Sequence, residues 1–358
     1  MFMNISKGIN FKWVVALGAL LASASFADQA PAQSENQTRT EFLKVLDRPR
    51  VDAKADLHPL LTMDGSKRSH LWFSSNDRER VPGVVQFPDA KQFKGRRPVV
   101  IALHGTGGVK EAGDVAQFIT KATDAGFIGV AIDGRFHGER TEMGGGAIAY
   151  NNAVALAFKS GEGHPFYYDT VWDVMRLIDY LITRKDVDPV RIGLTGFSKG
   201  GIETYLTAAA DPRVAAAVSY IGVQSFKWAL DNGAWRARVL TIEDGFTEAA
   251  KEAGKSPREV EFVREFYARV VPGIDAQFDG PAMLPLIAPR PLLVVNSDSD
   301  ANTPIAGVRL AVRAAEAAYR AANASDKFSF VLQENTGHRV NPENIDAGVA
   351  WFVKWLKP

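Results

Sequence analysis

Ser198 is the central residue of the pentapeptide GFSKG, which matches the pattern G-x-S-x-G. In this pattern, a sharp turn between a strand and a helix leaves the serine hydroxyl exposed as a nucleophile. The apolar residues 190–196 predict a strand before the serine, and residues 200–210 predict a helix after it. Glycines two positions before and after the serine leave room for these elements to approach closely. The competing interpretation is an ordinary turn in which Ser198 only caps the helix.

A serine hydroxyl is a weak nucleophile at neutral pH, so it needs a base to take its proton and a carboxylate to orient that base. The chain has six histidines, and only His338 follows Ser198. His338 comes directly after a predicted strand at residues 328–333. Ligands gather at the carboxyl ends of strands in doubly wound sheets. We therefore predict that His338 is the base, the alternative being a solvated or structural histidine.

The acid is expected after the preceding strand, where the segment NSDSDANTP offers Asp298 and Asp300. Asp300 is the better candidate because Ser297, a turn residue, lies three positions before it and Pro304 lies four positions after it. This spacing is typical of the acid loop in serine hydrolases with the G-x-S-x-G turn. Asp298 is then expected to be a turn or helix-capping residue.

A glycine-rich segment, HGTGG at residues 104–108, follows the apolar run 97–103. It resembles the HGGG-type loop whose backbone N–H groups bind the oxyanion formed during acyl transfer. We predict that the backbone N–H groups of Thr106 and Lys199 form the oxyanion hole. His104 is expected to shape this loop by hydrogen bonding, and the Lys199 side chain is expected to be solvated. A tight turn without a catalytic role is the alternative.

A second polar segment, DGRFHGER at residues 133–140, follows the next predicted strand. Its histidine, acids and arginines suggest a metal or anion site, but the chain has no H-E-x-x-H pattern and no cysteine. We instead expect Asp133 and Arg135 to form a buried interaction that organises the pocket wall. His137 and Glu139 are candidates for contact with substrate. No metal site is predicted.

The elements that must position these residues alternate regularly along the chain. Apolar strands and amphipathic helices follow one another from about residue 97 to the end, after two β-like runs near residues 70 and 81. Apolar strands separated by long helices require a parallel sheet covered on both faces. The sequence therefore predicts an α/β fold with a doubly wound, mostly parallel sheet of about eight strands and helices on both faces.

Two long segments interrupt the alternation, the glycine-rich residues 136–168 and residues 223–285. Long segments inside a compact domain usually carry function. We predict that both form walls of a pocket, with residues 223–285 as a cap-like insertion. A surface insertion without function is the alternative. The residues that bind substrate are not predicted.

The first residues have the pattern of a secretory signal peptide. Lys7 and Lys12 precede an apolar run at residues 13–21, and small residues lead to a cleavage site before Asp28. The apolar run is shorter than a bilayer span, although an uncleaved anchor is the alternative. We predict a signal peptide at residues 1–27, then a single domain at residues 28–358 that is secreted or periplasmic and has no stable membrane insertion.

Charge and cysteine content exclude several function classes. Two of the 42 basic residues lie in the signal segment, which leaves 40 against 41 acidic residues. Such a near-neutral chain without a basic block gives no reason to expect nucleic acid as a partner. The absence of cysteine excludes disulfides, thiolate metal sites and a cysteine nucleophile. Covalent chemistry must use another side chain, and oligomeric state is not predicted.

Together these motifs resemble the α/β-hydrolase superfamily from about residue 70 to residue 358. The chain looks most like secreted esterases related to acetyl xylan esterases, dienelactone-hydrolase-like proteins and prolyl-oligopeptidase catalytic domains. The resemblance implies a Ser198–Asp300–His338 triad, hydrolysis through an acyl-enzyme, and no cofactor. True dienelactone hydrolases use a cysteine nucleophile, which this chain lacks. The propeller of prolyl oligopeptidases would not fit in the roughly 40 residues between the signal segment and the first β-like run.

The sequence thus favours a serine carboxylic-ester hydrolase. Acyl groups on plant polysaccharide and small acyl esters are the expected substrates. A serine peptidase or amidase with the same triad is the alternative enzyme. A binding protein that keeps the fold without activity is the alternative outside enzymes.

Overall fold

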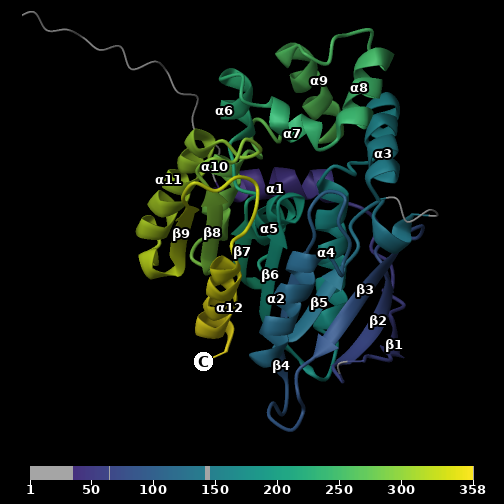
Figure 1. The fold of residues 1–358 in the computed structure, drawn as a ribbon, viewed down its shortest axis with the longest axis vertical. Helices are drawn as coiled ribbons and strands as arrows, with labels where there is room; N and C mark the ends of the chain where they lie inside the picture. Colours follow the sequence, from purple (N-terminus) through teal and green to yellow (C-terminus); the bar gives the residue numbers. More distant parts are fainter. Residues whose placement is uncertain (1–34, 64, 142–145, 358) are drawn as a thin grey trace, which may run out of the picture. The chain divides into compact units, whose positions relative to one another are not determined.

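A nine-stranded sheet forms the centre of the described part of the chain, in the order β1-β2-β3-β5-β4-β6-β7-β8-β9 (Figure 1). The computed structural model describes residues 35–63, 65–141 and 146–357. The predicted signal segment, residues 1–27, lies outside the described residues. The strands are β1 Asp56–Leu60, β2 Lys67–Ser74, β3 Arg80–Phe87, β4 Arg97–Leu103, β5 Ile128–Ile132, β6 Val187–Phe197, β7 Val214–Tyr220, β8 Leu292–Ser297 and β9 Phe328–Gln333.

Strands β5, β4, β6, β7, β8 and β9 pair in parallel, and β1, β2 and β3 extend the sheet in antiparallel fashion beyond β5. The prediction of an α/β, mostly parallel sheet is confirmed. The nine strands observed agree with the prediction of about eight, and the additional strand is β1, which was not recognised in the sequence. Its sequence, DLHPL, is largely exposed and contains a proline. It therefore has neither the apolar run nor the alternation that indicates a strand.

Helices cover both faces of the sheet, as predicted. One face is covered by α2 Gly113–Asp124 and α12 Pro342–Leu356. The other face is covered by α4 Tyr168–Leu181, α5 Lys199–Ala210 and α11 Ile305–Ala321. Helix α1 Glu35–Leu46, which the sequence did not predict, contacts α4 and α5.

The central strand β4 shows how the two faces are filled. Its residues Val99, Ile101 and Leu103 belong to the core that contains α4 and α5. Val100 and Ala102 belong to the core that contains α2 and α12. All five side chains are at most 2% exposed. Burial on both faces explains why such a strand is apolar at every position rather than at alternate ones.

The two interrupting segments contain helices. Residues 136–168 include helix α3, whose buried residues Tyr150, Val154 and Phe158 lie four positions apart, as on one face of a helix. The glycines that precede this helix led to the prediction of a loop. Helices α8 and α9 contact α3, and this helical layer lies beyond the carboxyl ends of the parallel strands (Figure 1). The helices of these segments and the remaining short helices are η1 Gly138–Arg140, α3 Gly146–Ser160, α6 Phe226–Asp231, α7 Arg236–Leu240, α8 Glu243–Glu252, α9 Val260–Val270, α10 Gly280–Met283, η2 Leu284–Ile287 and η3 Ser325–Lys327.

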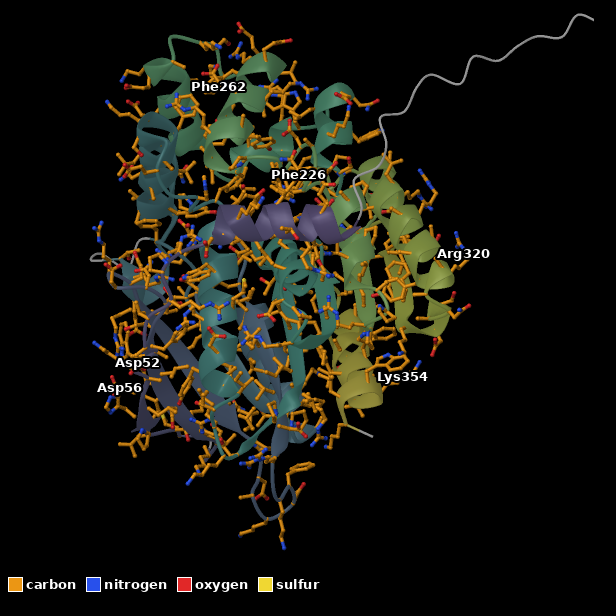
Figure 2. The ribbon with its side chains drawn as sticks, turned by 180° about the vertical axis from the view of Figure 1, so that it is seen from behind. Asp52, Asp56, Phe226, Phe262, Arg320 and Lys354 are labelled. Atoms are coloured by element: carbon orange, nitrogen blue, oxygen red, sulfur yellow. The ribbon has the colours of Figure 1, made fainter. Side chains whose placement is uncertain are left out.

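Apolar packing holds the helical layer together. Figure 2 shows Phe226 and Phe262 inside it, where both are buried. Phe262 contacts Phe246 with ring centroids 5.1 Å apart. Over the residues that the structure covers, no helix is both long and apolar enough to span a bilayer.

The turn from β6 into α5 passes β4 at a distance that excludes any side chain. A Cβ atom on Gly196 would lie 2.3 Å from the carbonyl oxygen of Gly200. A Cβ atom on Gly200 would lie 2.4 Å from the carbonyl oxygen of Leu103 in β4. Both contacts are with backbone, which cannot rotate away. The expectation that these glycines allow the strand and the helix to approach closely is confirmed.

The substitution Gly200→Ala should therefore lower the free energy of unfolding by about 1 to 3 kcal/mol, because the added methyl group forces β4 and α5 apart. Urea denaturation followed by circular dichroism measures this change. Gly113→Ala is the matched control, because a Cβ atom there meets nothing within 4 Å. A Gly200→Ala variant as stable as the control would contradict the packing described.

Candidate active site

Ser198 occupies the turn between β6 and α5 in a strained backbone conformation. Its φ is 54° and its ψ is −112°, a region that non-glycine residues rarely adopt. The Ser198 N–H donates to the carbonyl of Tyr220 in β7 at 2.9 Å, and the Ser198 carbonyl accepts from Ile202 N–H in α5 at 3.0 Å. The side chain makes no capping hydrogen bond with α5. The interpretation of Ser198 as a helix-capping serine is therefore wrong.

The structure brings Ser198, His338 and Asp300 together in one chain of hydrogen bonds. His338 Nε2 lies 2.7 Å from Ser198 Oγ, and His338 Nδ1 lies 2.7 Å from Asp300 Oδ2. A carboxylate only accepts, so Nδ1 carries the proton and Nε2 is free to accept from the serine hydroxyl. This arrangement is what a serine nucleophile and its general base require.

Asp300 is fully buried at its side chain and strongly hydrogen bonded. Besides His338, it accepts from the Asn302 N–H at 2.8 Å and from the Thr303 hydroxyl at 2.7 Å. Burial alone raises the pKa of the Asp300 carboxyl, but the hydrogen bonds from His338, Thr303 and Asn302 outweigh it and hold the pKa below its ordinary value. Asp300 is therefore ionised at neutral pH and can orient the imidazole.

Asp298, the other acidic candidate, lies on the surface and organises the loop that carries His338. Its carboxylate accepts from the backbone N–H groups of Asn335 at 3.0 Å and Thr336 at 3.3 Å. Its predicted role as a turn-capping residue is confirmed. At the other end of this loop, Gln333 Oε1 accepts from the Asn341 N–H at 2.8 Å.

The HGTGG segment, residues 104–108, lies directly beside the serine. A Cβ atom on Gly105 would lie 3.4 Å from the Cβ of Ser198. His104 Nδ1 donates to the carbonyl of Gly105 at 2.7 Å, so the prediction that His104 shapes this loop is confirmed. The first N–H of a helix has no partner within that helix, which leaves the N–H of Lys199 at the start of α5 available to an oxyanion.

The side chain of Lys199 is not solvated, and this expectation is wrong. Lys199 is 1% exposed and forms an ion pair with Glu203, one helical turn later in α5. Burial raises the pKa of the Glu203 carboxyl to about 7, although the Lys199 ammonium lowers it. The ion pair between Lys199 and Glu203 could have been predicted from the sequence, because residues four apart on a helix lie side by side.

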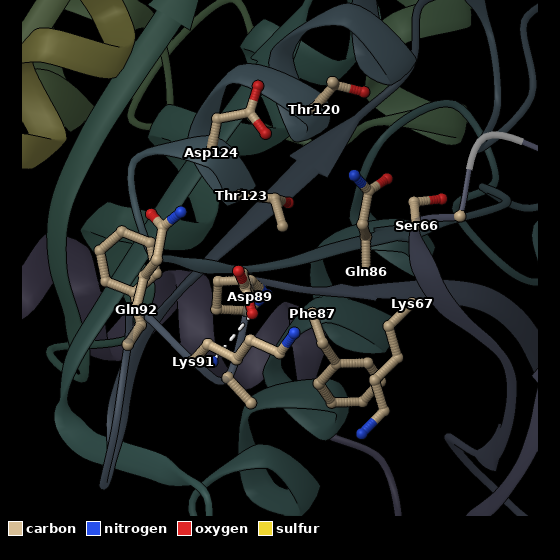
Figure 3. A pocket seen from close by; sticks show the side chains of 14 residues that line it. Ser66, Lys67, Gln86, Phe87, Asp89, Lys91, Gln92, Thr120, Thr123 and Asp124 are labelled. Atoms are coloured by element: carbon tan, nitrogen blue, oxygen red, sulfur yellow. Dashed lines mark hydrogen bonds between the residues drawn. The ribbon is translucent and has the colours of Figure 1, made fainter.

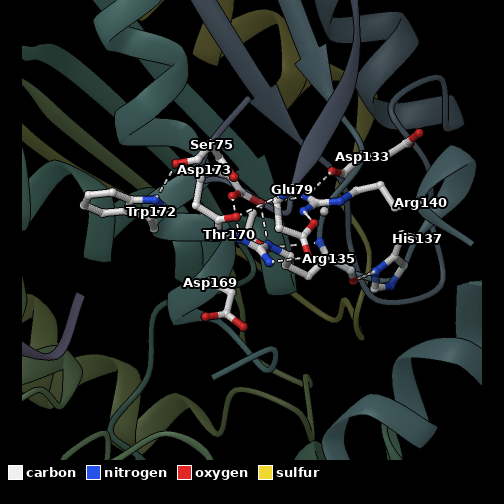
Figure 4. A network of polar contacts seen from close by, with 12 residues as sticks. Ser75, Glu79, Asp133, Arg135, His137, Arg140, Asp169, Thr170, Trp172 and Asp173 are labelled. Atoms are coloured by element: carbon white, nitrogen blue, oxygen red, sulfur yellow. Dashed lines mark hydrogen bonds and ion pairs between the residues drawn. The ribbon is translucent and has the colours of Figure 1, made fainter. Parts of the chain in front are cut away.

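The DGRFHGER segment forms different ion pairs from the one expected (Figure 4). Asp133 does not pair with Arg135. Instead, Asp133 accepts from Lys110 Nζ and from the Lys110 N–H, both at 2.8 Å. Arg135 binds both carboxylate oxygens of Asp173 in α4, at 2.8 and 2.9 Å. The partners Lys110 and Asp173 come from other elements, so proximity in sequence was a poor guide to pairing.

Asp173 is the centre of a buried charge network. It accepts from Arg135 and Arg140, and both arginines also contact Glu79, which precedes β3. Burial alone raises the pKa of Asp173, but the charges of Arg135 and Arg140 outweigh it and hold the pKa well below its ordinary value. This network fixes the segment after β5 to α4.

His137 does not present an open side chain to a substrate, whereas the Glu139 side chain is 43% exposed. His137 is fully buried, and its Nε2 accepts from the Gly107 N–H at 3.1 Å. Glu139 pairs with Lys110 and with His70. The suggestion that His137 contacts substrate is not supported by its buried position, and the same suggestion for Glu139 stays a prediction. Among the described residues, no group of three or more His, Asp or Glu side chains is arranged to hold a metal ion.

A large pocket lies near the amino ends of the parallel strands, at the opposite end from Ser198 (Figure 3). Its volume is about 740 Å³, and Gln86, Asp89 and Thr123 are among the residues that line it. Gln86 pairs with Gly129 at the amino end of β5. Ser198, Asp300 and His338 instead follow the carboxyl ends of β6, β8 and β9, so this pocket does not serve them.

Comparisons with known proteins agree with an esterase fold. The sequence profile of the acetyl xylan esterase (AXE1) family matches residues 34–231, and that of fungal glucuronyl esterases matches residues 158–323. The Bacillus subtilis (strain 168) protein YtaP, which is named as a hydrolase, is 25% identical over 299 residues, or 80% of this chain and 87% of YtaP.

Solved esterase structures share the fold at low sequence identity. Acetyl xylan esterase 1 from Thermoanaerobacterium has a TM-score of 0.62 at 20% identity, with 90% of this chain and 94% of that chain covered. A glucuronoyl esterase from Solibacter usitatus has a TM-score of 0.59 at 17% identity, with 89% and 92% covered. Both are α/β-hydrolase-type esterases, and the likeness concerns the fold.

Replacing Asp173 by asparagine tests the buried charge network. The substitution leaves Arg135 and Arg140 buried with less compensation, so the free energy of unfolding at pH 7 should fall by about 3 to 5 kcal/mol. Because the pKa of Asp173 is depressed in the folded state, its contribution is complete above a pH of about 4 and is lost as the pH falls further. The difference between variant and wild type should therefore shrink in acid, as measured by urea denaturation across pH.

Asp231→Asn is the matched control, because Asp231 pairs with Lys227 and Arg264 on the surface. Its loss should cost at most about 1 kcal/mol. Equal effects of the two substitutions would contradict a stabilising role for the Asp173 network.

Proposed function

The chain belongs to the acetyl xylan esterase (AXE1) family, and from this premise we propose that it hydrolyses carboxylic esters through an acyl-enzyme on Ser198. The observation that carries the proposal is the continuous hydrogen-bond chain from Asp300 through His338 to Ser198. Family membership supports an esterase, and the hydrogen-bond chain supports the choice of residues. An inactive binding protein with this fold would have no need of such an arrangement.

In the first step, His338 Nε2 takes the proton of the Ser198 hydroxyl while Oγ attacks the acyl carbon of the ester. The carbonyl oxygen becomes an oxyanion, which we assign to the backbone N–H groups of Thr106 and Lys199. Asp300 remains ionised and stabilises the imidazolium that forms on His338. The depressed pKa of Asp300 suits this role.

In the second step, the tetrahedral intermediate collapses and the bond to the alcohol breaks. The imidazolium of His338 gives its proton to the departing alkoxide, which leaves the acyl group on Ser198 Oγ. A water molecule then enters, loses a proton to His338 and attacks the acyl carbon. The carboxylic acid departs and Ser198 regains its proton. The mechanism as proposed needs no cofactor.

We propose acyl groups on plant polysaccharide as the substrate class, with small acyl esters accepted as well. The family match supports acetyl esters of xylan in particular. The His338 side chain is 28% exposed, and an accessible catalytic base suits esters carried on a polymer. The match to fungal glucuronyl esterases over residues 158–323 makes glucuronyl esters the second candidate.

We also propose that the protein acts outside the cytoplasm. The support is the signal-peptide pattern of residues 1–27, with cleavage before Asp28. A polysaccharide ester is an extracellular substrate, so export and substrate class agree.

The substitution Ser198→Ala should reduce kcat for p-nitrophenyl acetate by about 10⁴- to 10⁶-fold, because it removes the nucleophile of the triad. The wild-type enzyme should also release acetate from acetylated xylan. Ser160→Ala is the control, since Ser160 lies at the exposed end of α3. If purified Ser198→Ala, free of other esterases, retained activity, the proposed mechanism would be wrong.

The same assay decides between substrate classes. Initial rates are compared for acetylated xylan, a methyl ester of glucuronic acid and an aminoacyl p-nitroanilide. A higher kcat/KM for the glucuronate ester would select the second candidate. A strong preference for the anilide would show a peptidase or amidase instead of an esterase.

Asp300→Asn and Asp298→Asn form a matched pair that tests the identity of the acid. Asp300→Asn should lower kcat by about 10⁴-fold, because the amide favours the wrong tautomer of His338. Asp298→Asn should keep kcat within about tenfold, because its carboxylate binds loop backbone rather than the imidazole. A larger loss in Asp298→Asn than in Asp300→Asn would reverse the assignment.

A further inference from the structure

Two loops meet near Ser198, where the carboxyl ends of the parallel strands lie. The first, called here the oxyanion loop, is residues 104–108 after β4. The second, called the histidine loop, is residues 133–140 after β5. Because β4 and β5 are parallel neighbours, both loops leave the sheet at the same edge. The proposed function uses the first loop and assigns nothing to the second.

The two loops exchange hydrogen bonds through a pair of histidines. His104 of the oxyanion loop accepts at Nε2 from the Gly134 N–H of the histidine loop, at 2.9 Å. His137 of the histidine loop accepts at Nε2 from the Gly107 N–H of the oxyanion loop, at 3.1 Å. The two rings lie beside each other, with centroids 4.9 Å apart. Each loop is thus fastened to the other by its own histidine.

Both imidazoles must be neutral for this exchange. His104 Nδ1 faces the Gly105 carbonyl and His137 Nδ1 faces the Arg135 carbonyl, each at 2.7 Å. A carbonyl oxygen only accepts, so the proton of each ring is on Nδ1 and the lone pair is on Nε2. A second proton on either ring would set an N–H against a backbone N–H and break the link between the loops.

The surroundings keep both rings neutral. Burial and then the Lys199 ammonium lower the pKa of His104 to about 4 and that of His137 to about 2. The charged groups facing His104 are Lys199 of α5, Asp133 of the histidine loop and Lys110, which follows the oxyanion loop. Lys199 and Arg140 face His137, and the Tyr150 ring of α3 packs on it at 4.5 Å.

These contacts set the direction of the N–H group that is assigned to the oxyanion. A trans peptide is planar, so its C=O and N–H point in opposite directions. The carbonyl of Gly105 accepts from His104 and from the Gly108 N–H at 3.1 Å. The N–H of Thr106 belongs to the same peptide plane and must therefore point away from both. His137 fixes the next peptide plane by binding the Gly107 N–H.

We propose that His137 is a positioning residue of the oxyanion hole, which together with His104 forms a neutral two-histidine clasp that aims the Thr106 N–H at the acyl oxygen. This inference rests on the proposed function, because it assigns a role within the same reaction. His137 touches neither the nucleophile nor the base, so it acts through the oxyanion loop alone. Lys199 contributes twice, by its backbone N–H to the oxyanion and by its side chain to the neutrality of the clasp.

The test compares two substitutions at one position. His137→Phe keeps a ring against Tyr150 and His104 but removes the acceptor for the Gly107 N–H. His137→Gln restores an acceptor oxygen at similar reach. With p-nitrophenyl acetate, His137→Phe should lower kcat by about 10- to 100-fold and change KM by less than about threefold, a smaller loss than deleting a whole oxyanion donor. His137→Gln should recover kcat to within about fivefold of wild type.

His164→Phe is the matched control, because His164, which is partly buried, also faces a backbone carbonyl through its Nδ1, that of Val270. It should keep kcat unchanged. A trifluoromethyl ketone, which forms an oxyanion on the serine, should lose affinity for His137→Phe by the same factor as kcat/KM. Thermal melting of each variant establishes that the proteins compared are folded.

Equal kcat for folded His137→Phe and His164→Phe overturns the inference, and so does a His137→Gln variant no better than His137→Phe. If His137→Phe does not fold, His137→Asn decides the question, because its shorter side chain cannot place an acceptor where Nε2 binds the Gly107 N–H. His137→Asn should lose kcat as described for His137→Phe, and a kcat equal to that of His137→Gln overturns the clasp. An active Ser198→Ala variant would instead defeat the proposed function, so the two failures are distinguishable.

Discussion

The conformation of Ser198 is the constraint on which the rest of the site depends. A positive φ at a non-glycine residue costs free energy and persists only where the surroundings over-determine it. The Ser198 N–H donates to the Tyr220 carbonyl of β7, and the Ser198 carbonyl accepts from the Ile202 N–H of α5. The glycines on either side remove the side chains that would keep β4, β6 and α5 apart. The strained turn is thus a product of the whole centre of the sheet.

The sheet also explains how distant residues meet at this turn. Ser198, Asp300 and His338 lie after β6, β8 and β9, and these strands are joined in order through β7. Parallel pairing brings their carboxyl ends to one edge, where short loops are enough to close the hydrogen-bond chain. Asp298 and Gln333 then hold the His338 loop from two sides. These contacts hold the backbone of the loop, and the hydrogen bond to Asp300 orients the ring of His338, the base in our proposal.

The fold and the three residues of the hydrogen-bond chain could be predicted because their signals are local. Apolar runs mark the buried strands, and a strand end marks where a catalytic side chain must be placed. The ion pairs could not be predicted in the same way. Arg135 pairs with Asp173 in α4 and Asp133 pairs with Lys110, partners that only the packing of separate elements selects. Strand β1 and helix α3 were missed for a related reason, since tertiary contacts outweigh their weak sequence patterns.

Residue 199 illustrates how unevenly the two parts of one amino acid can be constrained. Its backbone N–H is supplied by every residue except proline, so the oxyanion contact alone would leave the position free to vary. The side chain has no such freedom, because it is enclosed with Glu203 and a Cβ atom on Gly134 would lie only 3.0 Å from its ammonium nitrogen. An arginine would keep the charge but bring a larger, planar head into the same space. A replacement at position 199 must therefore match both volume and charge, and few should be tolerated even though any residue except proline can supply the backbone N–H.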